Sequence, residues 1–123
     1  MQTSLYDRIG GESAIMAAVD LFYEKVLGDE TTRRFFDGVD MAAQTRKMVA
    51  FMAWAFDGPS EYLGGDLRAS HAKLVRERGL GDTHFDAVAR HLKSTLEELG
   101  VAPALIEESL SRVAGTRDAV LDR

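Results

Sequence analysis

Apolar residues recur every three or four positions along most of the chain, which is the spacing of amphipathic helices. Breaks that contain glycine divide this pattern into segments at residues 12–27, 41–56, 66–78, 84–99 and 103–114. No run alternates apolar and polar residues as a strand would, and the β-branched residues are scattered. The pattern predicts an all-α protein whose residues 1–123 form a single domain.

Residues that typically cap helices stand at the ends of these segments. Asp40 precedes the second segment, where its carboxylate can accept hydrogen bonds from the free amides of the first turn. Thr83 followed by Asp86 is a capping-box pattern that opens the fourth segment, on which Leu99 is expected to face the core. Pro103 is well placed to begin the last helix.

Composition and charge exclude several classes of protein. A net charge of -5 argues against a nucleic-acid partner, because no dense basic face offsets the 20 acidic side chains. The chain has no cysteine, so disulfides, iron–sulfur clusters, thiolate zinc sites and cysteine nucleophiles are excluded. No apolar run is long enough for a membrane span and the N-terminus does not resemble a signal peptide, so a cytoplasmic location is expected.

One of the three histidines, His71, lies on the apolar stripe of the short segment at residues 66–78. His84 and His91 lie well off the stripe of their own segment and are expected at the surface. An imidazole placed like that of His71 fits either a metal ligand or a structural histidine bonded to a carbonyl. The residue pattern alone favours the structural histidine.

The approach to His71 is rich in glycine. Residues 57–66 contain three glycines and a proline, and a backbone of this kind is poorly stabilised by its own contacts. A flat apolar cofactor between the short helix and the helix at 41–56 would anchor this segment.

A series of short sequences resembles the group I truncated haemoglobins, from about residue 4 to residue 119. Each is weakly specific, but their order and spacing together are specific to that family. They are Leu5-Tyr6-Asp7-Arg8-Ile9-Gly10-Gly11, Phe22-Tyr23-Glu24-Lys25-Val26-Leu27, Phe35-Phe36, Ala55-Phe56-Asp57-Gly58, and His71 followed by Gly79-Leu80 and His84-Phe85-Asp86-Ala87-Val88. The resemblance implies a truncated globin fold, in which a two-over-two helical sandwich encloses haem and reversibly binds oxygen and other diatomic gases such as nitric oxide and carbon monoxide.

The resemblance also implies roles for particular residues. His71 becomes the proximal ligand of the haem iron, and Tyr23 and Gln44 become distal hydrogen-bond donors. Without the resemblance, the pattern around Tyr23 fits a core tyrosine equally well, and that around Gln44 fits an exposed glutamine on a helix. The side chains implied to line the haem are Phe36, Met48, Phe51, Phe85 and Leu92.

Lys47 and Met48 map onto the distal wall as well. The thioether of Met48 cannot donate a hydrogen bond, so a thinner distal network is expected. Lys47 has two interpretations. Its ammonium can reach water or a haem propionate, or its neutral amine can bind the iron when no gas is present. Coordination requires loss of the proton, which costs an ordinary lysine roughly 4–5 kcal/mol at pH 7.

Certain truncated haemoglobins attach haem covalently through a histidine in the last helix, where this chain has Thr116 and Arg117. Ordinary non-covalent haem b is therefore expected. The basic residues considered for its propionates are Arg46, Arg68, Lys73, Arg76 and Arg78.

Three alternatives to oxygen binding remain. The first is a haem redox enzyme, such as a nitric oxide dioxygenase or a peroxidase-like enzyme with a reductase partner. The second is an electron-transfer or redox-sensing protein, and the third is an interaction module without cofactor.

Overall fold

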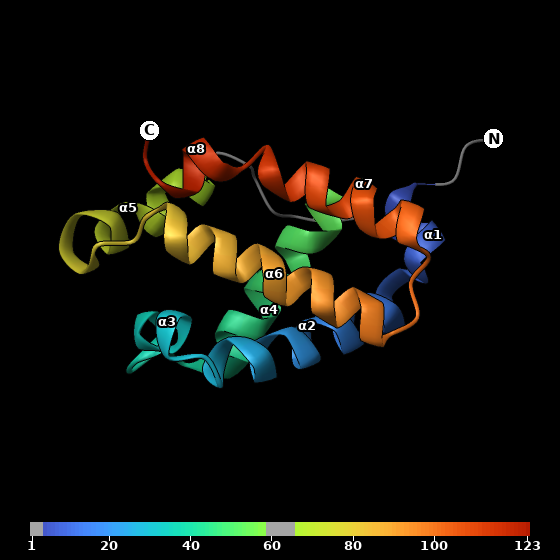
Figure 1. Cartoon of the computed structure of the whole chain (residues 1–123), viewed down its shortest axis with the longest axis horizontal. Coiled ribbons are helices and arrows are strands. Elements are labelled where there is room, and N and C mark those ends of the chain that lie inside the picture. Colours follow the sequence, from blue (N-terminus) through green and yellow to red (C-terminus); the bar gives the residue numbers. More distant parts are fainter. Residues whose placement is uncertain (1–3, 59–65) are drawn as a thin grey trace.

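The computed structural model describes residues 4–58 and 66–123, and the described chain contains helices and no strands. In chain order these are α1 (Leu5–Ile9), α2 (Gly11–Leu27), α3 (Glu30–Arg33), the 3₁₀ helix η1 (Arg34–Phe36), α4 (Met41–Ala55), α5 (Asp66–Arg78), α6 (Asp82–Glu98), α7 (Pro103–Ala114) and α8 (Arg117–Val120). Helix α2 packs against α4, α6 packs against α7, and α2 also contacts α6 (Figure 1). One helix pair therefore lies over another, as the resemblance to truncated haemoglobins implies.

The long helices begin and end close to their predicted positions. Asp40 caps α4, because its carboxylate accepts hydrogen bonds from the amides of Ala42 and Ala43 at 3.1 and 3.3 Å. Pro103 is the first residue of α7, as expected from its fixed φ. The short helices α1, α3 and α8 have no counterpart among the predicted segments. In the described residues, no helix combines the length and the apolar character that a membrane span requires.

The start of α6 differs from the prediction. The helix begins at Asp82 with Gly81 as its N-cap, so Thr83 lies inside the first turn and the predicted capping box is wrong. The imidazole of His84 reaches back instead, and its Nδ1 accepts a hydrogen bond from the Gly81 amide at 3.0 Å. The prediction for Leu99 is also wrong. The helix ends one residue earlier, and Leu99 is 43% exposed.

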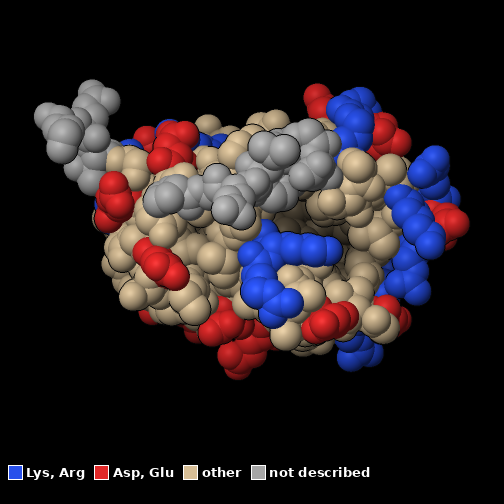
Figure 2. All heavy atoms as spheres, turned by 180° about the vertical axis from the view of Figure 1, so that it is seen from behind, with Lys and Arg blue, Asp and Glu red and all other residues tan. Residues whose placement is uncertain are grey.

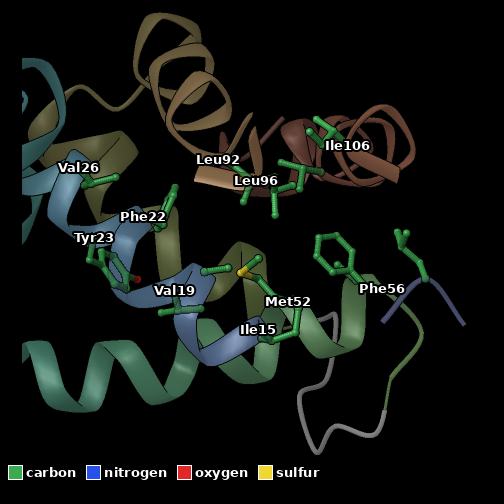
Figure 3. Close-up of a cluster of buried hydrophobic side chains, with 14 of the residues drawn as sticks. Ile15, Val19, Phe22, Tyr23, Val26, Met52, Phe56, Leu92, Leu96 and Ile106 are labelled. Atoms are coloured by element: carbon green, nitrogen blue, oxygen red, sulfur yellow. The ribbon is translucent and has the colours of Figure 1, made fainter. Parts of the chain in front are cut away.

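The main core lies between the two helix pairs. Figure 3 shows side chains of α2, α4, α6 and α7 that meet there, among them Ile15, Val19, Phe22, Tyr23, Val26, Met52, Leu92, Leu96 and Ile106. Among the described residues α5 supplies no side chain to this cluster, and its buried Leu67 lies outside it. Helix α5 lies instead at one end of the molecule, beside α8 (Figure 1). Residues 59–65, most of the glycine-rich approach, fall outside the described residues.

Candidate functional site

His71 lies on α5 with its imidazole partly exposed. Its Nδ1 is 2.8 Å from the backbone oxygen of Leu67, one turn earlier in the same helix. A carbonyl oxygen can only accept, so Nδ1 carries a proton, and in the neutral ring the lone pair lies on Nε2. A bond of this kind fixes the tautomer and the orientation of a histidine that ligates a metal. The geometry thus leaves Nε2 available as a ligand.

Tyr23 and Gln44 come together from different helices. The ring of Tyr23 on α2 is only 6% exposed, and the Gln44 side chain on α4 donates from Nε2 to its hydroxyl oxygen at 3.1 Å. Phe36 contacts the Tyr23 ring edge-on, with the ring centroids 5.6 Å apart. Burial raises the pKa of the Tyr23 phenol, and the Gln44 hydrogen bond offsets this only in part. The phenol therefore stays protonated at neutral pH, and its own O–H remains free to donate because Gln44 occupies an acceptor position.

The remaining distal candidates lie along α4. Met48 and Phe51 are half-buried and pack against the main core. Lys47 lies between Gln44 and Met48 in sequence, but its side chain is exposed and forms no ion pair or hydrogen bond with the described residues. The ammonium of Lys47 is thus uncommitted, while its neighbours are held by packing.

Three aromatic or aliphatic candidates have distinct surroundings. Phe36 is half-buried against the main core, beside Tyr23. Phe85 is buried, and the guanidinium carbon of Arg117 lies 4.5 Å from the centre of its ring. Leu92 is a buried member of the main core. The structure thus brings Phe36 to the Tyr23–Gln44 pair, and it places Phe85 and Leu92 on α6.

The described residues contain no group of three or more histidine, cysteine, aspartate or glutamate side chains that could hold a bare metal ion. A single imidazole such as that of His71 suits a metal that arrives with most of its ligands already supplied. Haem iron meets this condition, since the porphyrin provides four nitrogens and the protein adds one or two axial ligands.

Comparison with known proteins agrees with this geometry. The family described as bacterial-like globin matches residues 4–122. The chain is 46% identical over 113 residues to the group 1 truncated haemoglobin GlbN of Synechocystis sp., a match that covers 92% of this chain and 90% of the relative. The chain belongs to the group 1 truncated haemoglobins. It is also 46% identical over 119 residues to the group 1 truncated haemoglobin LI410 of Chlamydomonas moewusii, covering 97% of this chain and 68% of that relative.

Solved structures of truncated haemoglobins share the fold. The 2/2 haemoglobin of Synechococcus sp. PCC 7002, in the cyanomet state and with covalently attached haem, superposes with a TM-score of 0.93 at 45% identity, over 98% of this chain and 100% of that chain. THB1 of Chlamydomonas reinhardtii superposes with a TM-score of 0.84 at 51% identity, over 95% of both chains. The predicted two-over-two helical sandwich is therefore confirmed.

Haem b with iron is the cofactor of this family, and the residues present fit it. The free Nε2 of His71 is a suitable axial ligand, and Phe36, Met48 and Phe51 offer half-buried apolar surface. No histidine follows His91 in the sequence, so attachment through a histidine of the last helix is excluded and the haem is non-covalent.

The basic candidates for the propionates are not equivalent. Arg68 pairs with Asp122 at 3.2 Å, and Arg78 donates to the backbone oxygen of Arg34 at 2.8 Å, so both guanidinium groups are engaged elsewhere. Arg46 is exposed and, like Lys47, has no ion pair or hydrogen bond with the described residues. Figure 2 shows lysine and arginine side chains across and beside a hollow on the α4 side of the molecule.

Reasoning from the sequence did not identify the polar contacts of Arg68 on α5 and of Arg117 on α8. Arg117 bonds two carboxylates of α6, and Arg68 bonds the last residues of the chain. Nothing in the hydrophobic spacing points to such contacts, because the partners are 31 to 55 positions apart. His84 and His91, which were expected at the surface, are partly exposed and hydrogen-bonded.

Proposed function

We propose that this globin binds oxygen reversibly at the iron of non-covalent haem b, with Nε2 of His71 as the proximal ligand. Haem supplies a ferrous iron that binds diatomic gases when one axial position is open. The observation that carries the proposal is the hydrogen bond between His71 Nδ1 and the Leu67 oxygen, because it orients the ring and leaves Nε2 as the nitrogen that can bind iron. Phe36, Met48 and Phe51 would contact the porphyrin.

The distal role falls to Tyr23 and Gln44. A buried, protonated phenol whose acceptor side is taken by an amide is well suited to donate a hydrogen bond to a polar guest beside it. Gln44 orients the phenol from α4, and the edge contact with Phe36 limits rotation of its ring. Oxygen gains more from such a donor than carbon monoxide does, since oxygen held by ferrous iron carries more negative charge.

Nitric oxide and carbon monoxide are proposed as further ligands, because both are small diatomics that need no additional protein group. A reductase that keeps the iron ferrous is proposed as a partner. Turnover of nitric oxide to nitrate would use the same residues, so measuring it with a reductase present separates an enzyme from a carrier.

Lys47 keeps the two roles that its sequence position suggests. Its side chain is exposed and has no ion pair within residues 4–58 and 66–123, which supports an ion pair with a propionate. Its position one turn after Gln44 supports coordination of the iron in the absence of gas. The two roles differ in their spectra. Coordination gives a six-coordinate species that is lost in Lys47→Ala, whereas pairing with a propionate leaves the spectrum of that variant unchanged.

The central experiment is substitution of His71. His71→Ala should retain haem poorly, because no other described histidine lies on α5. The ferrous form of this variant should lack the iron–histidine stretching band. His91→Ala is the matched control, since His91 bonds Asp29 on a different part of the fold and should leave the haem spectrum intact. A normal haem spectrum in His71→Ala would refute the assignment.

A further inference from the structure

We propose that Arg68 and residues 117–123 form a clamp that positions α5, and with it His71, relative to the rest of the fold. We call this set of residues the C-terminal clamp. The proposal rests on His71 being the iron ligand, and it makes Arg68 a positioning residue that acts through the helix carrying that ligand.

The first observation concerns packing. Helix α5 contributes nothing to the main core among the described residues, and the only helix with which it makes extensive contact there is α8. Leu121, directly after α8, is 4% exposed and belongs to the main core. Among the described residues, the C-terminal segment is therefore the main packing partner of α5, while Arg78 at the far end of α5 bonds Arg34.

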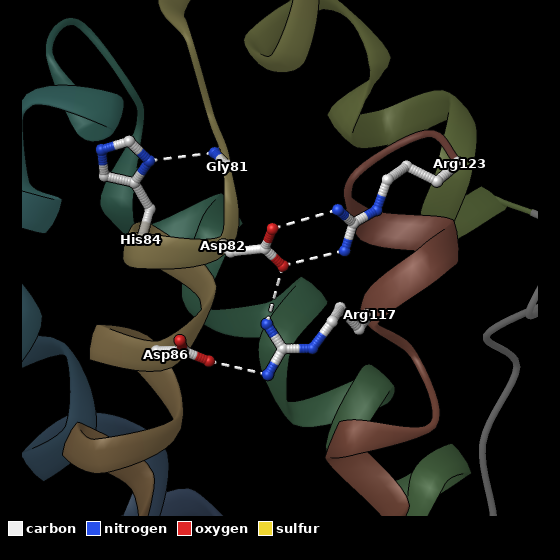
Figure 4. A network of polar contacts seen from close by, with 6 residues as sticks. All are labelled: Gly81, Asp82, His84, Asp86, Arg117 and Arg123. Atoms are coloured by element: carbon white, nitrogen blue, oxygen red, sulfur yellow. Dashed lines mark hydrogen bonds and ion pairs between the residues drawn. The ribbon is translucent and has the colours of Figure 1, made fainter.

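The second observation is a continuous path of polar contacts. Arg68 on α5 donates to Asp122 Oδ1 at 3.2 Å and to the backbone oxygen of Arg123 at 3.1 Å. The Arg123 guanidinium in turn donates to both carboxylate oxygens of Asp82 at 3.0 and 2.8 Å (Figure 4). Paired bonds between two planar groups fix their mutual orientation. The path runs from α5 through the end of the chain to the start of α6.

Arg117 strengthens the anchor on α6. It donates to Asp82 at 3.0 Å and to Asp86 at 2.7 Å, and Figure 4 shows its guanidinium between the two carboxylates. The same guanidinium lies over the buried ring of Phe85, 4.5 Å from its centre. With charge pairs on one side and an aromatic ring on the other, Arg117 holds the start of α8 in place.

The clamp acts close to the ligand. Arg68 directly follows Leu67, whose backbone oxygen accepts the hydrogen bond from His71 Nδ1. Holding Arg68 therefore holds the turn of α5 that orients the imidazole. When this network is broken, the end of α5 that carries Arg68 can shift, because the described bonds at the other end join Arg78 to Arg34 and do not hold Arg68. The main core keeps its packing, since α5 supplies no described side chain to it.

The test uses two single variants and their combination. Arg68→Gln removes the guanidinium, and Asp122→Asn removes its charged partner while keeping a residue that tolerates the φ of 56° at this position. Three quantities are measured: hydrogen exchange of residues 66–78 in the haem-free protein, the rate of haem transfer to excess apomyoglobin, and the iron–histidine stretching band of the ferrous protein. Arg90→Gln is the matched control, because Arg90 is exposed on α6 and has no ion pair or hydrogen bond with the described residues.

Each single variant should speed exchange in α5 and haem loss by about two- to fivefold, the range expected for exposed ion pairs. The iron–histidine band should broaden. The double variant should behave like Arg68→Gln alone, because Arg68→Gln already removes the contact with Asp122 as well as the contact with the Arg123 oxygen. The difference from the unaltered protein should shrink at about 1 M salt, where surface charges are screened. Arg90→Gln should change none of these quantities.

Three results would overturn the clamp: unchanged exchange in α5, additive effects in the double variant, or faster haem loss in Arg68→Gln with none in Asp122→Asn. The last of these would mean that Arg68 pairs directly with the cofactor. Failure of the proposed function is seen separately, as the absence of an iron–histidine band in the unaltered protein.

Discussion

Removal of the Tyr23 hydroxyl tests the proposed distal role of this residue. In Tyr23→Phe the ring stays, so the edge contacts with Phe22 and Phe36, at 5.2 and 5.6 Å between centroids, are kept. The loss is confined to the O–H group and to the bond it accepts from Gln44. The variant therefore changes hydrogen bonding with little change in packing, because the phenylalanine ring fills nearly the same volume.

The magnitude follows from the kind of hydrogen bond involved. A bond to an acceptor with charged character contributes about 1.5–3 kcal/mol. If that contribution is lost only when oxygen leaves, the dissociation rate of oxygen rises about ten- to hundredfold, at 1.4 kcal/mol for each factor of ten. Gln44 can replace part of the lost bond, because its amide is freed and still has N–H groups to donate. The lower end of the range is therefore expected, with carbon monoxide affected less.

The assay is displacement of oxygen by excess carbon monoxide, followed by stopped-flow absorbance. Tyr6→Phe is the control, since Tyr6 lies on α1 with its ring against Gly58 and should leave the rate unchanged. Gln44→Leu should raise the rate less than Tyr23→Phe does, and the two effects should not add, because the side chains are bonded to each other. An oxygen dissociation rate in Tyr23→Phe within twofold of the unaltered protein would refute the distal role of Tyr23.

Three further predictions test other parts of the structure. If Lys47 coordinates the iron, the six-coordinate ferric spectrum should grow as pH rises, because only the neutral amine binds. Lys47→Ala should then abolish that spectrum. A high-spin spectrum at every pH, unchanged in Lys47→Ala, would rule coordination out. Gly58→Ala should lower the midpoint of thermal unfolding, because a Cβ at Gly58 would lie 2.3 Å from a ring atom of Tyr6. Gly81→Ala should not, because a Cβ there would lie 3.8 Å from its nearest contact. Equal midpoints in the two variants would contradict this packing. Asp29 has a lowered pKa because the Thr31 amide and His91 bond its carboxylate. Its contribution to stability is therefore present above the ordinary pKa of 3.8 and is lost as pH falls through the lowered pKa. The stability of Asp29→Asn should fall less steeply at acid pH than that of the unaltered protein, and an identical fall in both would contradict the lowered pKa of Asp29.

The long helices could be predicted because each has a full apolar stripe and a recognisable end. The stripe of α2 and the caps at Asp40 and Pro103 appear in the sequence as local patterns. The short helices α3 and α8 have only four residues each, too few to show a period. The cap of α6 was missed because histidine is an uncommon cap, and the geometry that lets His84 reach the Gly81 amide is not a sequence pattern.

The candidate site likewise contains some contacts that could be predicted from the sequence and others that could not. The resemblance gave Tyr23 and Gln44 the same distal role, and the two side chains meet because α2 and α4 pack against each other. The hydrogen bond from His71 to the Leu67 oxygen lies within one helical turn, and a bond from this ring to a backbone carbonyl was expected. The engagement of Arg68 with Asp122 was not, because a charged residue on a short helix has many partners within reach and sequence does not choose among them.

The two sides of the proposed haem site are supported by different parts of the fold. Tyr23 belongs to the main core, and Gln44 lies on α4, which packs against α2, so the distal side is held by packing that exists without cofactor. His71 lies on a helix outside that core, so binding of haem through His71 adds the contact that α5 lacks. Loss of haem should therefore remove exchange protection from α5 before it affects α2 or α4. It follows that substitutions of Tyr23 and Gln44 should change gas dissociation at nearly constant haem affinity, whereas substitutions in α5 and α8 should change haem affinity at nearly constant gas dissociation.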